Sequence, residues 1–316
     1  MTNSKPKILI VGAPNERHSH YMAQRIAQKG GSPLILDTLN FPAKVKLSLR
    51  NEKIFYQGEP LDEIAGCYLR TVVFFLPPYD LEDKRNAEGK LETDNWYRDY
   101  RAERERQSHL GSLLRVLFFR NIPVVNPVSA FTLHYLKPLQ LEMLRREGIR
   151  VPETLVTNDP KKLLEFKQEV GKVIFKPVAG GAECRELTEE HLKPEKLERL
   201  QNAPVLFQEL IPGENVRVYI LESRILVAVI IKSETLDYRG HEQGFQIINL
   251  PPEVAQICIK AMRICGLKFT GMDLRLTPGG EFVVIECNPS AMFMGIEEIL
   301  KVDISGALAD FLMGRS

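Results

Sequence analysis

The sequence predicts an α/β protein that is built from more than one unit. Three observations support this: a β-loop-helix-β order within the first 37 residues, strands that alternate with helices after residue 123, and two strands joined by a Pro-Gly-Gly turn near the C-terminus. A β-loop-helix-β order is typical of a parallel sheet, whereas a tight turn joins antiparallel strands. With 316 residues the chain is long enough for two or three such units.

Composition narrows the class of protein. The chain is 44% hydrophobic and 26% charged, as is usual for a globular protein. Its 42 basic and 41 acidic residues give a net charge of +1, which does not favour a nucleic-acid partner. The longest aliphatic run, Ile225–Ile231, is strand-sized, so we expect no membrane span. Five scattered cysteines without a CxxC pair indicate reduced thiols in a cytoplasmic protein.

The first 120 residues are expected to form the parallel unit and a long helix. A buried strand over Lys7–Gly12, a helix over Ser19–Lys29 and a strand over Pro33–Asp37 make its first crossover. The polar, Pro-bearing stretch 77–95 is predicted to be an exposed loop. A helix is expected over 96–120, with an apolar face formed by Leu110, Leu113, Leu114, Leu117 and Phe118.

The most informative stretch is the predicted hairpin of Met272–Leu276 and Glu281–Asn288, joined by a Thr-Pro-Gly-Gly turn. Side chains of a strand alternate between its faces, so Glu286 and Asn288 share one face. A four-residue turn brings Asp273 to that same face. Oxygen donors without His or Cys suit a hard cation such as Mg²⁺. The alternative is a polar sheet edge with unrelated acids.

Four cations are candidates for holding an anion. Lys176 ends an apolar strand beside the loop Ala179–Ala182, whose backbone N–H groups can approach phosphate oxygens. Lys137 stands at a helix start, and Arg217 and Arg239 carry guanidinium groups that suit phosphate or carboxylate. Each also has a simpler interpretation as a surface or structural residue. The strand that contains Gln208 and Glu209 ends in a Pro-Gly turn, which suggests a hinge between units.

Taken in order, these residues resemble the ATP-grasp superfamily, within its ribosomal protein S6 modification and glutathione-synthetase-like branch. The resemblance is closest to the microviridin-type (graspetide) peptide maturases. It rests on Leu69-Arg70-Thr71, Val125-Asn126-Pro127, Lys137–Leu141, Pro152–Pro160, Asp237-Tyr238-Arg239 and Glu286–Ser290. Asn215 stands where that family usually has Asp or Glu, and Ala291–Met294 differs from the Gly-Gln and aromatic residues common in the maturases.

The resemblance implies a fold and a role for each residue. It implies a parallel pre-ATP-grasp α/β domain over 1–125, a central lobe or lid over 126–208, and a C-terminal lobe with the metal site over 209–316. The phosphates of ATP would be contacted by Lys137 and Lys176, and adenine by a hinge of Gln208, Glu209 and Leu210. One or two Mg²⁺, with Mn²⁺ as a substitute, would be bound by Asp273, Glu286 and Asn288. Arg217 and Arg239 would steady the γ-phosphate or an acyl phosphate.

The implied activity is that of a carboxylate–amine or carboxylate–hydroxyl ligase that works through an acyl phosphate and releases ADP. Two alternatives stay open: a maturase that makes ester or amide side-chain links in a ribosomal peptide, and a non-catalytic ATP-binding or regulatory module. The expected partners are a carboxylate substrate, which a peptide can supply, and an amine or hydroxyl acceptor. A homo-oligomer is compatible with this hypothesis, whereas nucleic acid and membrane are not expected.

Overall fold

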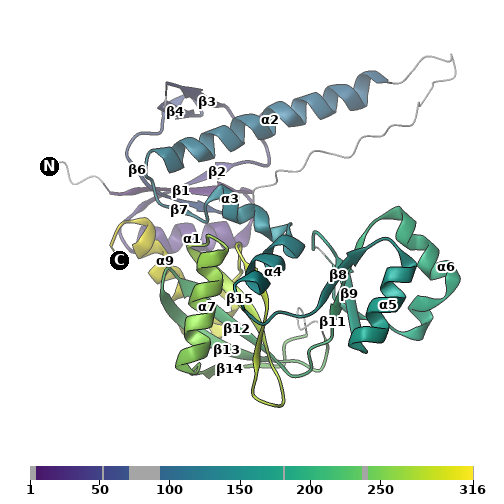
Figure 1. Ribbon diagram of the computed structural model, residues 1–316. Coiled ribbons are helices and arrows are strands. Elements are labelled where there is room, and N and C mark those ends of the chain that lie inside the picture. The colour runs from purple at the N-terminus through teal and green to yellow at the C-terminus, as the bar shows by residue number, and fades with distance from the viewer. Residues whose placement is uncertain (1–4, 52, 71–92, 181, 237–240, 316) are drawn as a thin grey trace. The chain divides into compact units, whose positions relative to one another are not determined.

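The computed structural model describes residues 5–51, 53–70, 93–180, 182–236 and 241–315. The chain divides into two compact units, the first formed by Met1–Val128 with Ala309–Ser316 and the second by Ser129–Leu308 (Figure 1). The expected three-domain division stays a prediction. The expected loop over 77–95 lies mostly outside the described residues.

The first unit contains the predicted parallel sheet, with strand order β2-β1-β6-β7. Its strands are β1 (Lys7–Gly12), β2 (Ser32–Asp37), β6 (Ile64–Leu69) and β7 (Val124–Val125), and α1 (Arg17–Gln28) links the first two. The apolar run Ile8–Val11 is completely buried, as expected for a strand covered on both faces. A small antiparallel sheet adds β3 (Leu47–Arg50), β4 (Lys53–Tyr56) and β5 (Glu59–Pro60).

The long helix α2 (Thr93–Phe119) is confirmed, but its apolar face is narrower than predicted. Four leucines of that face are buried: Leu110, Leu113, Leu114 and Leu117. Phe118, which the spacing placed beside them, is 58% exposed. Phe118 follows Leu117 by about 100° around the helix, so the last turn carries it off the buried stripe.

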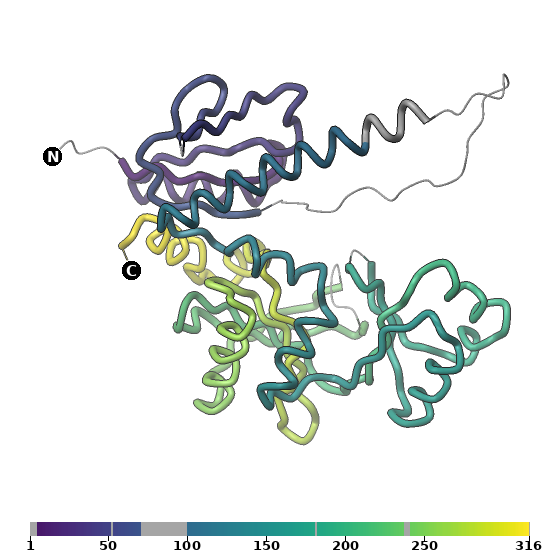
Figure 2. Tube along the Cα trace, turned by 45° about the horizontal axis from the view of Figure 1, so that its top comes forward, coloured from purple at the N-terminus to yellow at the C-terminus, as the bar shows by residue number. Residues whose placement is uncertain are grey.

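The second unit is built on two antiparallel sheets (Figure 2). The smaller has the order β10-β9-β11-β8 and consists of β10 (Arg185–Glu186), β9 (Val173–Pro177), β11 (Val205–Glu209) and β8 (Thr154–Thr157). Helix α5 (Pro160–Val170) packs beside it, and Asp159 caps this helix by accepting the N–H of Lys161 at 2.8 Å. The cap and the Pro at the first helical position agree with the sequence.

The larger sheet carries the predicted hairpin. Its order is β14-β13-β12-β15-β16, with β14 (Gly244–Ile248), β13 (Arg224–Lys232), β12 (Glu214–Leu221), β15 (Phe269–Leu276) and β16 (Phe282–Asn288). In the β15–β16 register Asp273 lies opposite Glu286, on the face that the sequence predicted. A four-residue turn alone would pair Leu276 with Glu281, whereas Leu276 pairs with Phe282, and a bulge directly after Asp273 adds the second one-residue shift that restores the face. Helices α4 (Lys137–Arg146) and α7 (Pro252–Ile264) pack against this sheet.

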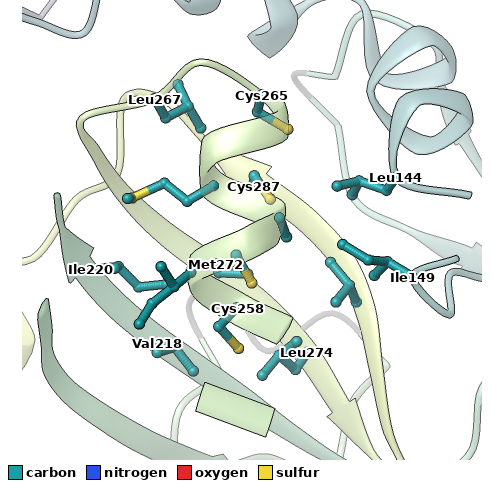
Figure 3. Packing of buried hydrophobic residues seen from close by; sticks show 14 of the residues in the cluster. Leu144, Ile149, Val218, Ile220, Cys258, Cys265, Leu267, Met272, Leu274 and Cys287 are labelled. Carbon is teal, nitrogen blue, oxygen red and sulfur yellow. The ribbon is translucent and has the colours of Figure 1, made fainter. Parts of the chain in front are cut away.

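Strand alternation divides the larger sheet into a core face and a polar face. Met272 and Leu274 enter the core together with Val218 of β12 and Cys287 of β16. Figure 3 shows these residues around α7, together with Cys258 of that helix and Cys265, which directly follows it. The core side chains fix which way the strands face, so the residues between them must point to the other side. Within the part of the chain that the structure describes, none of the five cysteines forms a disulfide.

The remaining helices are short. The second unit also contains α6 (Pro194–Leu197) and α8 (Met294–Leu300), whereas α3 (Val128–Phe131) and α9 (Ile304–Leu312) cross the borders of the two units. Among the described residues, no helix combines the length and the apolar character that crossing a bilayer requires.

Gly213, in the turn between β11 and β12, provides a test of this architecture. Its φ is +127°, and a Cβ there would lie 1.9 Å from the carbonyl oxygen of Leu276. We expect Gly213→Ala to destabilise the protein by at least about 2 kcal/mol, because backbone atoms must move apart. Thermal unfolding measures this. Gly279→Ala is the control, since the nearest atom to its Cβ is 3.8 Å away; equal stability of the two variants would contradict the packing of this turn.

Candidate active site

The second unit contains a cavity of about 380 Å³ that is lined by residues of both sheets. Nine of the ten site residues predicted from the sequence line it: Lys137, Lys176, Gln208, Glu209, Leu210, Arg217, Asp273, Glu286 and Asn288. The tenth, Arg239, lies outside the described residues. The structure therefore brings these nine residues together from one helix and five strands, while the role of each residue stays a prediction.

The ammonium group of Lys137 forms an ion pair with the carboxylate of Glu286. Lys137 begins α4 and Glu286 lies near the end of β16, so this pair connects the helix to the hairpin. Their side chains are only 12% and 14% exposed. Burial raises the pKa of Glu286, but Lys137 and Lys176 outweigh burial and bring this pKa below its ordinary value. Glu286 is therefore an ionised carboxylate at neutral pH.

Lys176 approaches the same carboxylate from the smaller sheet. It lies on β9 opposite Leu206 and is part-buried. Burial lowers the pKa of the Lys176 ammonium, Glu286 opposes this shift, and Lys137 adds to it. Two ammonium groups thus share one carboxylate, which leaves the cavity with capacity for a further anion.

A glycine in the loop after β9 allows the backbone to approach this cluster. Gly180 has a φ of +82°, and a Cβ there would lie 3.4 Å from Cε of Lys137. The absence of a side chain keeps the loop backbone open beside the ammonium group, which is the arrangement that an incoming phosphate needs.

Arg217 and Asp273 form a second pair, across β12 and β15. The Arg217 Nε–H and Nη2–H groups donate to Oδ1 and Oδ2 of Asp273 at 2.6 and 3.0 Å. This bidentate geometry follows from the register, in which the two residues lie directly opposite. Asp273 in turn lies opposite Glu286, so these two carboxylates are adjacent and each has a basic partner.

Asn288 completes the predicted metal set. Its Oδ1 accepts the N–H of Ser290 at 2.9 Å, and its backbone carbonyl accepts the hydroxyl of Thr270 at 3.0 Å. These bonds hold the chain in place where it leaves β16. An amide oxygen has a second lone pair, so Asn288 retains an acceptor for a cation.

The donor set fits Mg²⁺ by its chemistry: two carboxylates and an amide oxygen, all hard oxygen ligands. Among the described residues, no group of three or more His, Cys, Asp and Glu is arranged to hold a metal ion. This finding does not test the predicted set, because Asn288 is an amide. Glu286 and Asp273 each form an ion pair with a basic side chain. A bound phosphate can compete for these basic side chains and so release the carboxylates.

The hinge residues lie at the end of β11. Glu209 points to Arg150, whose Nη2 lies 3.2 Å from both carboxylate oxygens. The Gln208 side chain is completely buried, and its Nε2 donates to the Thr154 hydroxyl at 3.0 Å. Its Oε1 is buried and has no hydrogen-bond partner in the described structure. A buried acceptor of this kind fits an exocyclic amine of a bound base.

Sequence reasoning missed several residues of the cavity, of which Arg275 is the clearest. Its Nη1–H donates to Oδ1 of Asn215 at 2.6 Å and its Nε–H to the carbonyl of Ile211 at 3.1 Å. Arg275 follows Asp273 by two residues on β15, so strand alternation alone could have placed it on the same face. His134 and Cys184 also line the cavity, and no pattern in the sequence singled them out.

Comparison with known proteins agrees with this geometry. The structure is similar to that of the ATP-grasp ligase PsnB complexed with the precursor peptide PsnA2 and AMPPNP, with a TM-score of 0.83 and 35% identity. The match covers 100% of this chain and 99% of PsnB. The macrocyclase MdnC from Microcystis aeruginosa MRC, bound with the precursor peptide MdnA, has a TM-score of 0.78 at 24% identity, covering 98% and 100%. That second likeness shows the fold alone.

Curated relatives match a shorter part of the chain. A probable alpha-L-glutamate ligase of Rhodopirellula baltica is 28% identical over 187 residues, which are 55% of this chain and 46% of the relative. The chain thus spans about half the length of that relative. The model of the RimK-like ATP-grasp domain matches residues 136–312, which is more than half of the chain and contains every residue that lines the cavity except His134. The protein therefore belongs to the RimK-like ATP-grasp family of ligases.

Proposed function

We propose that the protein is an ATP- and Mg²⁺-dependent ligase that joins a carboxylate of a peptide to a hydroxyl or an amine. The observation that carries this proposal is the cavity in which two lysines and Arg217 converge on adjacent carboxylates. The full-length likeness to PsnB, which was solved with a precursor peptide and AMPPNP, supports a peptide as the substrate.

In this proposal the nucleotide phosphates replace the carboxylates as partners of the basic side chains in the cavity. Lys137 leaves Glu286 for a phosphate oxygen, and Lys176 donates to the same phosphate chain from β9. The buried Oε1 of Gln208 accepts a hydrogen bond from the exocyclic amine of adenine. Asp273, Glu286 and Asn288 would hold Mg²⁺, which supplies neutralisation of charge on the phosphates when it is bound.

The chemistry needs no protein nucleophile. An oxygen of the substrate carboxylate forms a bond to the γ-phosphorus while the bond from that phosphorus to ADP breaks, which gives an acyl phosphate. The hydroxyl or amine of the acceptor then attacks the acyl carbon, loses a proton and displaces inorganic phosphate. Arg217 is positioned to steady the transferred phosphoryl group, and Arg239 stays a candidate for the same role. The cavity contributes alignment and charge neutralisation, which are the main demands of phosphoryl transfer.

The substrate class can be tested by measuring ADP release and product mass together. The probe is a candidate precursor peptide, encoded beside the gene and rich in Thr, Ser and Lys with Glu and Asp, compared with free glutamate. We expect ADP release with the peptide alone and a product lighter by one water for each bond formed. A product that gains glutamyl residues would identify a glutamate ligase instead. Nucleotide binding without ADP release for any carboxylate would favour the regulatory alternative.

Replacement of Glu286 tests the proposed metal site. Glu286→Gln keeps the shape of the side chain but removes the charge that pairs with Lys137 and would bind Mg²⁺. We expect ADP release to fall by at least about a hundredfold, in line with the loss of a charged metal ligand and its stabilisation of the transition state. Glu281→Gln, at the exposed side of the same hairpin, is the matched control and should retain activity. Activity of Glu286→Gln within a few-fold of the control would disprove the assignment.

A further inference from the structure

Gln140 makes an unusual contact with the strand that carries Glu286 and Asn288. Its side chain lies on α4 and is 1% exposed. Its Nε2 donates to the carbonyl of Cys287 at 2.8 Å, and its Oε1 accepts the N–H of Cys287 at 2.8 Å. One carboxamide therefore satisfies both backbone groups of a residue that lies 147 positions away in sequence.

The position of β16 explains why this contact is needed. β16 is the last strand of its sheet, so its outer edge has no neighbouring strand to pair its backbone groups. Unpaired groups on a buried edge are costly. The carboxamide has the same donor and acceptor as a peptide unit, and Gln140 takes the place of the missing strand at Cys287. Further along the edge, the N–H of Val284 donates to the carbonyl of Arg150 at 3.0 Å.

The contact lies between the two proposed metal ligands of β16. Cys287 is completely buried and points into the core (Figure 3). Its neighbours Glu286 and Asn288 line the cavity. Fixing the backbone at Cys287 therefore fixes where both neighbouring side chains begin.

Helix α4 thus contacts β16 at two points that are one turn apart. At the first, Lys137 pairs with Glu286 in the cavity. At the second, Gln140 binds the backbone of Cys287. The first contact is an ion pair that would separate in the proposed function, because Lys137 would bind a phosphate and Glu286 would bind Mg²⁺. The second is neutral and buried, so ligand binding leaves it intact.

We propose that Gln140 is a positioning residue, which keeps Glu286 and Asn288 in place for Mg²⁺ after Lys137 has moved to a phosphate. This inference rests on the proposed function. It assigns the placement of the proposed metal ligands to a side chain that touches neither metal nor nucleotide. Partners of this kind commonly change metal affinity or activity by about 10–100-fold when they are removed.

The test is Gln140→Met, which keeps the length of the side chain and removes both hydrogen bonds. We expect the Mg²⁺ concentration for half-maximal ADP release to rise about tenfold or more, with the KM for the peptide unchanged. Calorimetric binding of AMPPNP in the presence of Mg²⁺ should weaken in parallel. Hydrogen exchange at the amide of Cys287, which Gln140 protects in the wild type, should become faster.

Two further variants keep the result interpretable. Gln140→Glu retains the acceptor for the Cys287 amide and removes the donor, so it should shift Mg²⁺ dependence in the same direction even if Gln140→Met does not fold. Val254→Ala shortens a core side chain of α7 and controls for lost stability. A Mg²⁺ dependence of the Gln140 variants equal to that of Val254→Ala would overturn the positioning role alone. A wild-type protein that binds no AMPPNP with Mg²⁺ would overturn the proposed function, and this inference with it.

Discussion

The ion pair between Lys137 and Glu286 is the interaction on which the rest of the site depends. It joins the first residue of α4 to the hairpin and places a basic and an acidic group in a cavity with little access to water. A charge in such a place needs a partner, because the cost of desolvation is otherwise several kcal/mol. Arg217 and Asp273 meet the same requirement beside it. These two pairs therefore compensate their own charges, and Lys176 adds a further positive charge beside them.

This balance explains why nucleotide and metal belong together in the proposed function. A phosphate that attracts Lys137 leaves Glu286 without its nearest cation, and a metal ion restores that compensation. A metal ion bound alone would instead crowd the lysine and arginine that already occupy the carboxylates. In the proposed function the same carboxylates pair with the protein's cations in this structure and would bind the metal once ATP occupies the cavity. The coupling follows from electrostatics within one small cavity.

Much of this arrangement follows from local sequence rules. The parallel first unit follows from the β-loop-helix-β order. The hairpin follows from the Pro-Gly turn, but Asp273 lies opposite Glu286 because of a bulge directly after Asp273, which no local pattern predicted. Strand alternation separated Asp273 and Glu286 from Met272 and Cys287 of the core. The joining of distant segments into one cavity came from the resemblance to a known family, because no local pattern states which strands meet.

The rest could not be predicted for physical reasons. Strand alternation predicts the face on which a side chain lies, but it does not predict which partner a long arginine or lysine side chain binds. The ion pairs of Lys137 and Arg217 were therefore not predicted. Gln140 looked like one more polar residue on α4, and its partner is a backbone group of a strand far along the chain. Phe118 fitted a helical pattern, yet the end of α2 turns it outward. Each outcome depends on packing between segments that are far apart in sequence, and local sequence patterns carry no information about such contacts.

The central claim is that the cations of the cavity exchange carboxylates for phosphates. A crystal structure of the protein with Mg²⁺ and AMPPNP tests it most directly, through the position of the Lys137 ammonium group. The account predicts that this group contacts a phosphate oxygen and that Glu286 has turned to the metal. A structure in which the nucleotide is bound and Lys137 still pairs with Glu286 would contradict it.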